Sequence, residues 1–78
     1  MSDYKMDIRG EIGLSEYSNI HDYLGVVDNN DSFTITLDNS DEHEINIINS
    51  MLKDNSFYII SEGYDSLGIY YITAYKAK

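Results

Sequence analysis

The sequence opens with alternating apolar and polar residues. Tyr4, Met6, Ile8 and Ile12 are separated by charged side chains over most of this stretch. A period of two is typical of a β-strand with one face on a core and the other in water. Gly10 interrupts the apolar row, which indicates a bulge or the close approach of another element. We therefore predict a first strand over residues 4–12.

Two segments follow the helical repeat instead. In the first, apolar residues recur at i, i+3 and i+7 between Ser15, a predicted N-cap, and Leu24. Gly25 supplies a natural stop. The second helix opens at residues 39–41, where Asp41 and Glu44 have the spacing of a capping box, and it ends near Asn55.

The remaining apolar runs predict strands. Residues 32–38 alternate cleanly, and residues 56–62 and 68–75 form two β-rich runs that a short connection, 63–67, joins as a hairpin. Val26 and Val27 precede the turn-forming residues 28–31, so residues 24–27 are predicted to pair with 32–38 as another hairpin.

The element order is therefore β-α-(β)β-α-β-β, where the bracketed strand is Val26–Val27. This order predicts an α+β fold with a small antiparallel sheet of four strands, or five if that segment contributes one, and two helices on one face. At 78 residues the chain is long enough for a single compact domain, residues 1–78.

The charge of the chain indicates more about its function than any motif does. The chain has 14 acidic and 5 basic residues, a net charge of −9, and residues 10–52 contain no Lys or Arg. Such a surface repels phosphate backbones and attracts basic proteins. Within that stretch we expect a basic partner to contact the acids Asp28, Asp31, Asp38, Asp41, Glu42 and Glu44.

The residues that usually provide catalysis, phosphate binding or metal binding are absent or have the wrong spacing. There is no cysteine, no glycine-rich phosphate loop and no GxSxG sequence, and acidic residues do not fall at the positions of an EF-hand loop. His21 is predicted to pack beside the buried face of the first helix and His43 to be exposed. We therefore predict no enzyme activity, no cofactor and no metal. The absence of cysteine and of any signal-like or membrane-spanning segment predicts a cytoplasmic protein.

Tyrosines crowd the last hairpin. Tyrosine provides contact area and a hydrogen bond at low entropic cost, so Tyr64 and Tyr70 are added to the predicted partner-binding residues. An exposed edge strand in this hairpin would also allow a homodimer. Direct nucleic-acid binding is not expected, because base stacking on tyrosines normally comes with a basic groove.

These features favour a small acidic inhibitor that docks a basic, nucleic-acid-binding partner by mimicking phosphate charge. In size and acidity, though in no motif, the chain is similar to phage-encoded inhibitors of host defence such as anti-CRISPR proteins. Two alternatives remain open. One is an immunity or antitoxin protein for a basic nuclease toxin, and the other is a self-associating accessory protein whose charge serves solubility.

Overall fold

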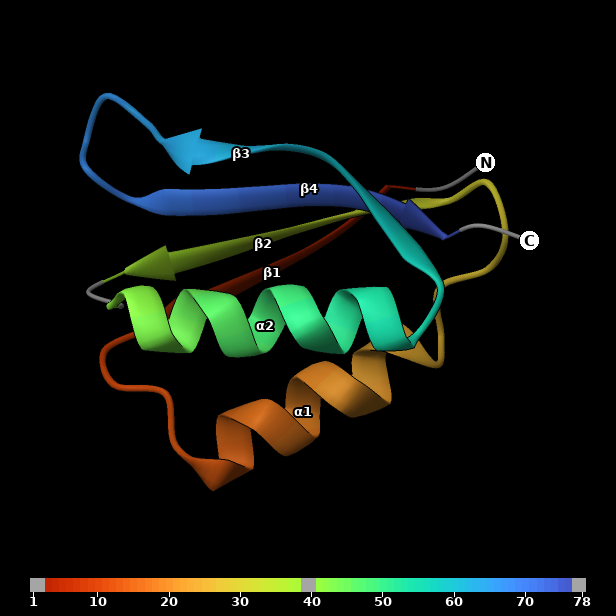
Figure 1. Ribbon diagram of the computed structural model, residues 1–78, viewed down its shortest axis with the longest axis horizontal. Coiled ribbons are helices and arrows are strands. Elements are labelled where there is room, and N and C mark those ends of the chain that lie inside the picture. The colour runs from red at the N-terminus through yellow and green to blue at the C-terminus, as the bar shows by residue number, and fades with distance from the viewer. Residues whose placement is uncertain (1–2, 39–40, 77–78) are drawn as a thin grey trace.

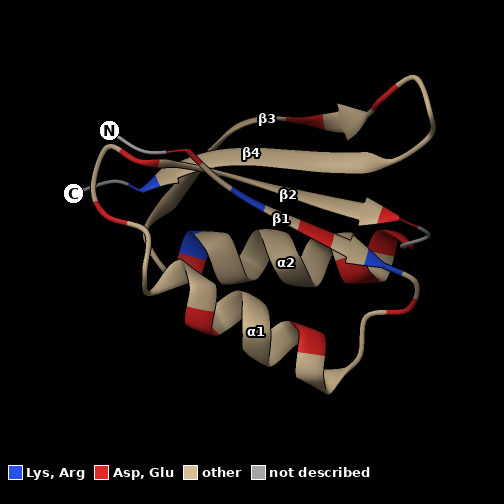
Figure 2. Ribbon diagram, turned by 180° about the vertical axis from the view of Figure 1, so that it is seen from behind, with Lys and Arg blue, Asp and Glu red and all other residues tan. Residues whose placement is uncertain are grey.

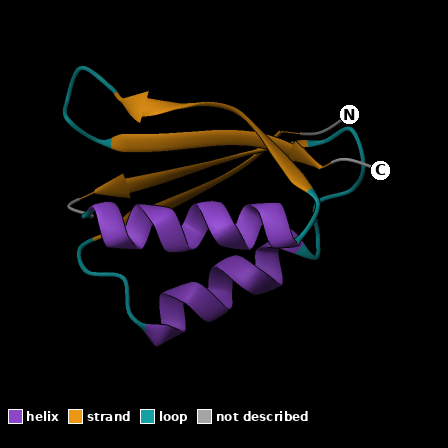
Figure 3. Cartoon of the chain, viewed as in Figure 1, coloured by secondary structure: helices purple, strands orange, loops and turns teal. Residues whose placement is uncertain are grey.

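The computed structural model describes residues 3–38 and 41–76 (Figures 1 and 3). Its elements are, in chain order, β1 (Asp3–Arg9), α1 (Leu14–Leu24), β2 (Ser32–Asp38), α2 (Glu42–Asp54), β3 (Phe57–Tyr64) and β4 (Tyr70–Lys76). The predicted α+β fold with four strands and two helices is confirmed. The predicted helix opening at Asn39 and Ser40 lies outside the described residues.

The sheet has the order β1-β2-β4-β3. β4 pairs antiparallel with both β2 and β3, as expected, but β1 and β2 run parallel, so the sheet is mixed rather than antiparallel throughout. The reason is α1, since a helix between two strands returns the chain to the end from which it started and allows parallel pairing.

The predicted strand at Val26–Val27 does not form, and the hairpin of residues 24–27 with 32–38 is wrong. α1 continues through Leu24, and its last turn closes with a hydrogen bond from the Val26 N–H to the Tyr23 carbonyl. Val27 is completely buried while Val26 is 59% exposed, so the pair anchors the loop after the helix. The predicted turn at residues 28–31 is confirmed by a hydrogen bond from the Asp31 N–H to the Asp28 carbonyl.

The core lies between the sheet and the two helices, which cover one face of it (Figure 1). Alternate residues of the central strands face the helices and are fully or almost fully buried, as the periodicity predicts. The largest buried side chains are Ile20, Leu24, Val27, Phe33, Ile35, Leu37, Ile48, Leu52 and Ile72. Within the described residues, no helix is long and apolar enough to cross a membrane.

Each helix begins at a different kind of cap. α1 starts two residues earlier than predicted: Gly13, not Ser15, is the N-cap, and the Glu16 carboxylate accepts a hydrogen bond from the Gly13 N–H at 2.7 Å. α2 has the predicted capping box, in which Asp41 accepts from the Glu44 N–H at 2.9 Å and Glu44 accepts from the Asp41 N–H at 3.1 Å. Asn55 ends α2, as predicted.

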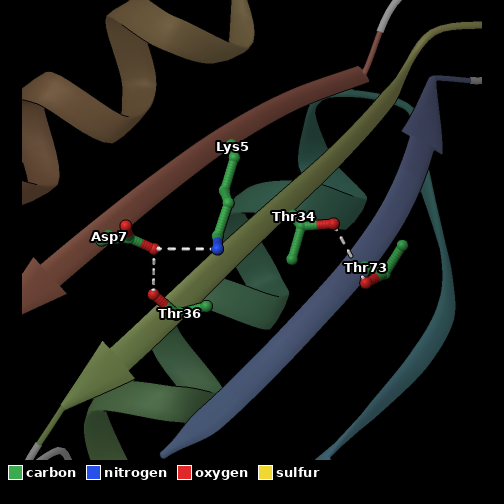
Figure 4. A network of polar contacts seen from close by, with 5 residues as sticks. All are labelled: Lys5, Asp7, Thr34, Thr36 and Thr73. Carbon is green, nitrogen blue, oxygen red and sulfur yellow. Dashed lines mark hydrogen bonds and ion pairs between the residues drawn. The ribbon is translucent and has the colours of Figure 1, made fainter.

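The other face of the sheet is covered by no helix within residues 3–38 and 41–76, and it carries hydroxyl and charged side chains (Figure 4). Thr34 and Thr73 are hydrogen-bonded across β2 and β4 at 3.1 Å. Thr36 donates to Asp7, whose carboxylate is also 3.9 Å from the Lys5 ammonium. A polar face of this kind is typical of a sheet that is covered on one side and exposed to water on the other.

Candidate protein-binding surface

The predicted partner-binding residues divide between two ends of the molecule. β2 separates them, because Asp31 precedes its first residue and Asp38 is its last. A seven-residue strand spans about 20 Å, so Asp28 and Asp31 lie far from the group at residues 38–44. Tyr64 and Tyr70 lie at the second end, since Tyr70 pairs with Leu37 near the end of β2.

The acids around residues 38–44 are joined by two that the prediction did not include. Both helices point their N-termini toward the end of β2 (Figure 1), and Figure 2 shows acidic residues gathered there. The Glu44 carboxylate accepts a hydrogen bond from the Ile12 N–H at 3.3 Å, which fixes the loop before α1 against α2. We call this surface the acidic end: Glu11, Glu16, Asp38, Asp41, Glu42 and Glu44.

Some carboxylates of the acidic end are occupied in holding the fold. Asp41 and Glu44 cap α2, and Glu16 caps α1, so these three serve backbone N–H groups at helix N-termini. By contrast, Asp38 and Glu42 are exposed and make no hydrogen bond or ion pair with the other described residues. They are the acids of this end that are most available to a partner.

The ring of Tyr17 lies within the field of the acidic end. Burial raises the pKa of the Tyr17 hydroxyl, and the negative charges of Glu44 and Asp41 raise it further. Ionising Tyr17 would place another negative charge beside these carboxylates, which like charges oppose. Tyr17 therefore lies close enough to the first turn of α2 to feel the charges of Asp41 and Glu44.

The opposite end carries acids as well, but bases accompany them. Asp31 is only 7% exposed, and its carboxylate accepts a hydrogen bond from the Asp28 N–H at 3.2 Å. The backbone of this turn is bonded to Lys76, and Lys53 lies in the last turn of α2 beside Asp54. Asp31 is therefore a structural residue, and the positive charges reduce the net charge of this end.

The two predicted tyrosines form a pair on the last hairpin. The ring centroids of Tyr64 and Tyr70 are 4.9 Å apart in an edge-to-face arrangement. Tyr70 is half-buried and donates a hydrogen bond to Glu62, whereas Tyr64 is 66% exposed. Burial, then the hydrogen bond to Glu62 and its charge, raise the pKa of Tyr70 to about 12. Tyr64 is thus the tyrosine that is open to a partner.

A shallow hollow of about 250 Å³ lies on the helix-free face near the acidic end. β1 contributes Lys5, Asp7 and Arg9, and Asp38 and Asp65 come from the end of β2 and the last hairpin. Arg9 and Asp38 are register partners on neighbouring strands. The lining mixes both signs of charge, so the hollow marks where the acidic end meets the bases of β1.

The histidines and acids of the described residues do not build a metal centre. No group of three or more potential ligands lies close enough together within residues 3–38 and 41–76. His43 is exposed, as predicted, but His21 is exposed as well, so its predicted packing role is wrong. In α1 the buried positions are Ile20 and Leu24, and His21 falls just outside that stripe.

The chain matches no protein-family model, and no curated protein or solved structure matches it.

Proposed function

We propose that this protein is a small binding module whose acidic end docks a basic, nucleic-acid-binding protein, with carboxylates taking the places of phosphates. One observation carries the proposal. Six carboxylates from the loop before α1, the end of β2 and the first turns of both helices lie at one end of the molecule. Arg9, the register partner of Asp38, lies at the same end.

The contact is expected to centre on Asp38 and Glu42. Both are exposed and have no bonded partner among the described residues, so a basic partner can pair with them without breaking the fold. Tyr64 lies at the same end, and its exposed ring offers apolar contact area beside the charges. The field of the acidic end should also speed encounter with the partner at low salt.

The test is a pair of matched charge reversals. Asp38→Lys with Glu42→Lys changes the charge at the acidic end, and Asp22→Lys with Asp54→Lys makes the same change in net charge on exposed helix positions nearer the other end. The tagged wild-type protein is used to capture partners from cell lysate at low and high salt. A captured protein should be lost with the first variant, retained with the second and displaced by added DNA or RNA.

Three results would count against the proposal. They are no capture at low salt, equal loss with both variants, and a captured protein that nucleic acid does not displace. A nuclease toxin and a defence protein both present basic surfaces, so their binding responds to charge and salt in the same way. Identifying the captured protein tells these two kinds of partner apart.

A further inference from the structure

Among the described residues, β1 and β3 form the two free edges of the sheet, and they differ in charge. Side chains of β1 that point away from the core are charged at every position: Asp3, Lys5, Asp7 and Arg9. Charged side chains on an edge strand block its pairing with another chain. The first five residues of β3, 57–61, carry no charge at all. The first five residues of the β3 edge therefore lack the charges that protect β1.

Exposed apolar side chains gather at this edge. Tyr58 and Ile60 are each 59% exposed, and Tyr75, the register partner of Tyr58 on β4, is 40% exposed. The rings of Tyr58 and Tyr75 are paired, with centroids 5.5 Å apart. A bulge between Ile59 and Ser61 breaks the pairing of β3 with β4 beside Ile60. We call Tyr58, Ile60 and Tyr75 the β3-edge patch.

We propose that the occupant of the β3-edge patch is a second copy of this chain, with the two β3 strands antiparallel about a two-fold axis. Such an axis makes the patch self-complementary, because each residue meets its counterpart in reverse order. This inference does not depend on the acidic end.

Charge favours a second copy in this orientation. β3 begins beside Lys76, the register partner of Phe57, and it follows the last turn of α2, in which Lys53 is offset by Asp54. β3 ends near Glu62 and Asp65. Antiparallel pairing brings Lys76 of one copy toward Glu62 of the other, whereas parallel pairing would bring like charges together. The uncharged segment 57–61 then lies at the centre of the interface.

The contact area is sufficient for a weak dimer. An aromatic side chain offers roughly 200 Å² of surface, so the exposed parts of the patch and the β3 backbone together remove roughly 1,000 Å² from water in two copies. That value reaches the lower limit for a specific interface, which is typical of weak or transient complexes.

The test measures the oligomeric state of the whole chain by sedimentation equilibrium over a range of concentrations. Ile60→Lys places a charge in the centre of the patch. Val26→Lys is the matched control, since Val26 is also β-branched and also 59% exposed but lies in the loop after α1. Far-ultraviolet circular dichroism verifies that both variants fold.

The wild-type protein should form a dimer, Ile60→Lys should weaken its dissociation constant at least tenfold, and Val26→Lys should leave it unchanged. Amides of β3 should also exchange hydrogen more slowly as the protein concentration rises. A wild-type protein that remains monomeric at millimolar concentration would overturn the proposal, as would equal weakening by the two variants. If Ile60→Lys fails to fold, the wild-type measurement and the β3 exchange rates decide alone.

Discussion

Replacing Glu44 by Ala should weaken the fold more than any other single change at the acidic end. Its carboxylate accepts hydrogen bonds from two backbone N–H groups, that of Asp41 at 3.1 Å and that of Ile12 at 3.3 Å. Only the first lies within the helix cap, and the second joins the loop before α1 to α2 across 32 residues. Glu44→Ala removes both bonds and leaves two N–H groups without this acceptor.

The expected loss follows from the number of bonds. A net contribution of roughly 0.5–1 kcal/mol for each partly exposed bond gives about 1.5 kcal/mol for the pair. For a domain of this size, that free energy lowers the melting temperature by about 6–12 °C. Glu44→Gln keeps one acceptor oxygen, so its effect should be about half as large.

The matched control is Glu42→Ala, two residues away on the same helix. Glu42 makes no bond with the other described residues, so its removal costs only its interaction with the helix dipole, about 0.5 kcal/mol. Urea unfolding followed by circular dichroism gives both free energies of unfolding. Exchange of the Ile12 amide should become faster in Glu44→Ala alone. If Glu44→Ala costs no more than Glu42→Ala, the tie between the loop and α2 contributes nothing to stability.

Three further changes test other parts of the structure. The pKa of Tyr70 is about 12 in the folded protein and 10.0 in the unfolded chain, so the unfolded chain loses this proton first as the pH rises. The free energy of unfolding should therefore fall between pH 10 and 12, and it should fall less steeply in Tyr70→Phe. Urea midpoints across this pH range measure the difference. Ile35→Ala removes a fully buried side chain from a central strand and should lower the free energy of unfolding by about 2–5 kcal/mol. That loss is a large part of a small domain's stability, so thermal unfolding should show a melting temperature far below that of the wild type. Replacing Thr34 and Thr73 together by Val removes both partners of one bond and should change the free energy of unfolding by less than about 1 kcal/mol, while each single change should cost more than the pair.

Local patterns were enough to predict most elements of the fold. The capping box of Asp41 and Glu44 placed the start of α2, and the alternation in residues 32–38 gave β2 with the bounds that the structure shows. Both signals depend only on neighbouring residues, which is why they can be found in one sequence.

The wrong predictions concern which segments form strands and which strands pair with each other. Val26 and Val27 have high strand propensity, yet Val27 fills the core after α1 and no strand forms there. Burial of one side chain outweighed the intrinsic preference, and strand propensity depends strongly on context. Periodicity also does not reveal which strands are neighbours, so the parallel pairing of β1 with β2 was missed.

The candidate surface was only half predictable for a similar reason. The count of acids was visible in the sequence, but their separation into two ends depends on the length and direction of β2. Glu11 and Glu16 join the acidic end because α1 and α2 point the same way, which is a property of the tertiary arrangement. The structural role of Asp31 follows from its burial, and no local sequence pattern indicates that burial.

The place of β4 in the sheet bears on how the chain acquires its structure. β4 comes last among the elements, yet it lies between β2 and β3 and supplies the hydrogen-bonding partner for both. Until it has emerged from the ribosome, β3 has no neighbour and β2 can pair only with β1. The apolar face of α2 then has an incomplete sheet beneath it. Productive folding should therefore begin only after residue 76 has left the ribosome, and ribosome-bound chains in which β4 is still enclosed should remain sensitive to protease.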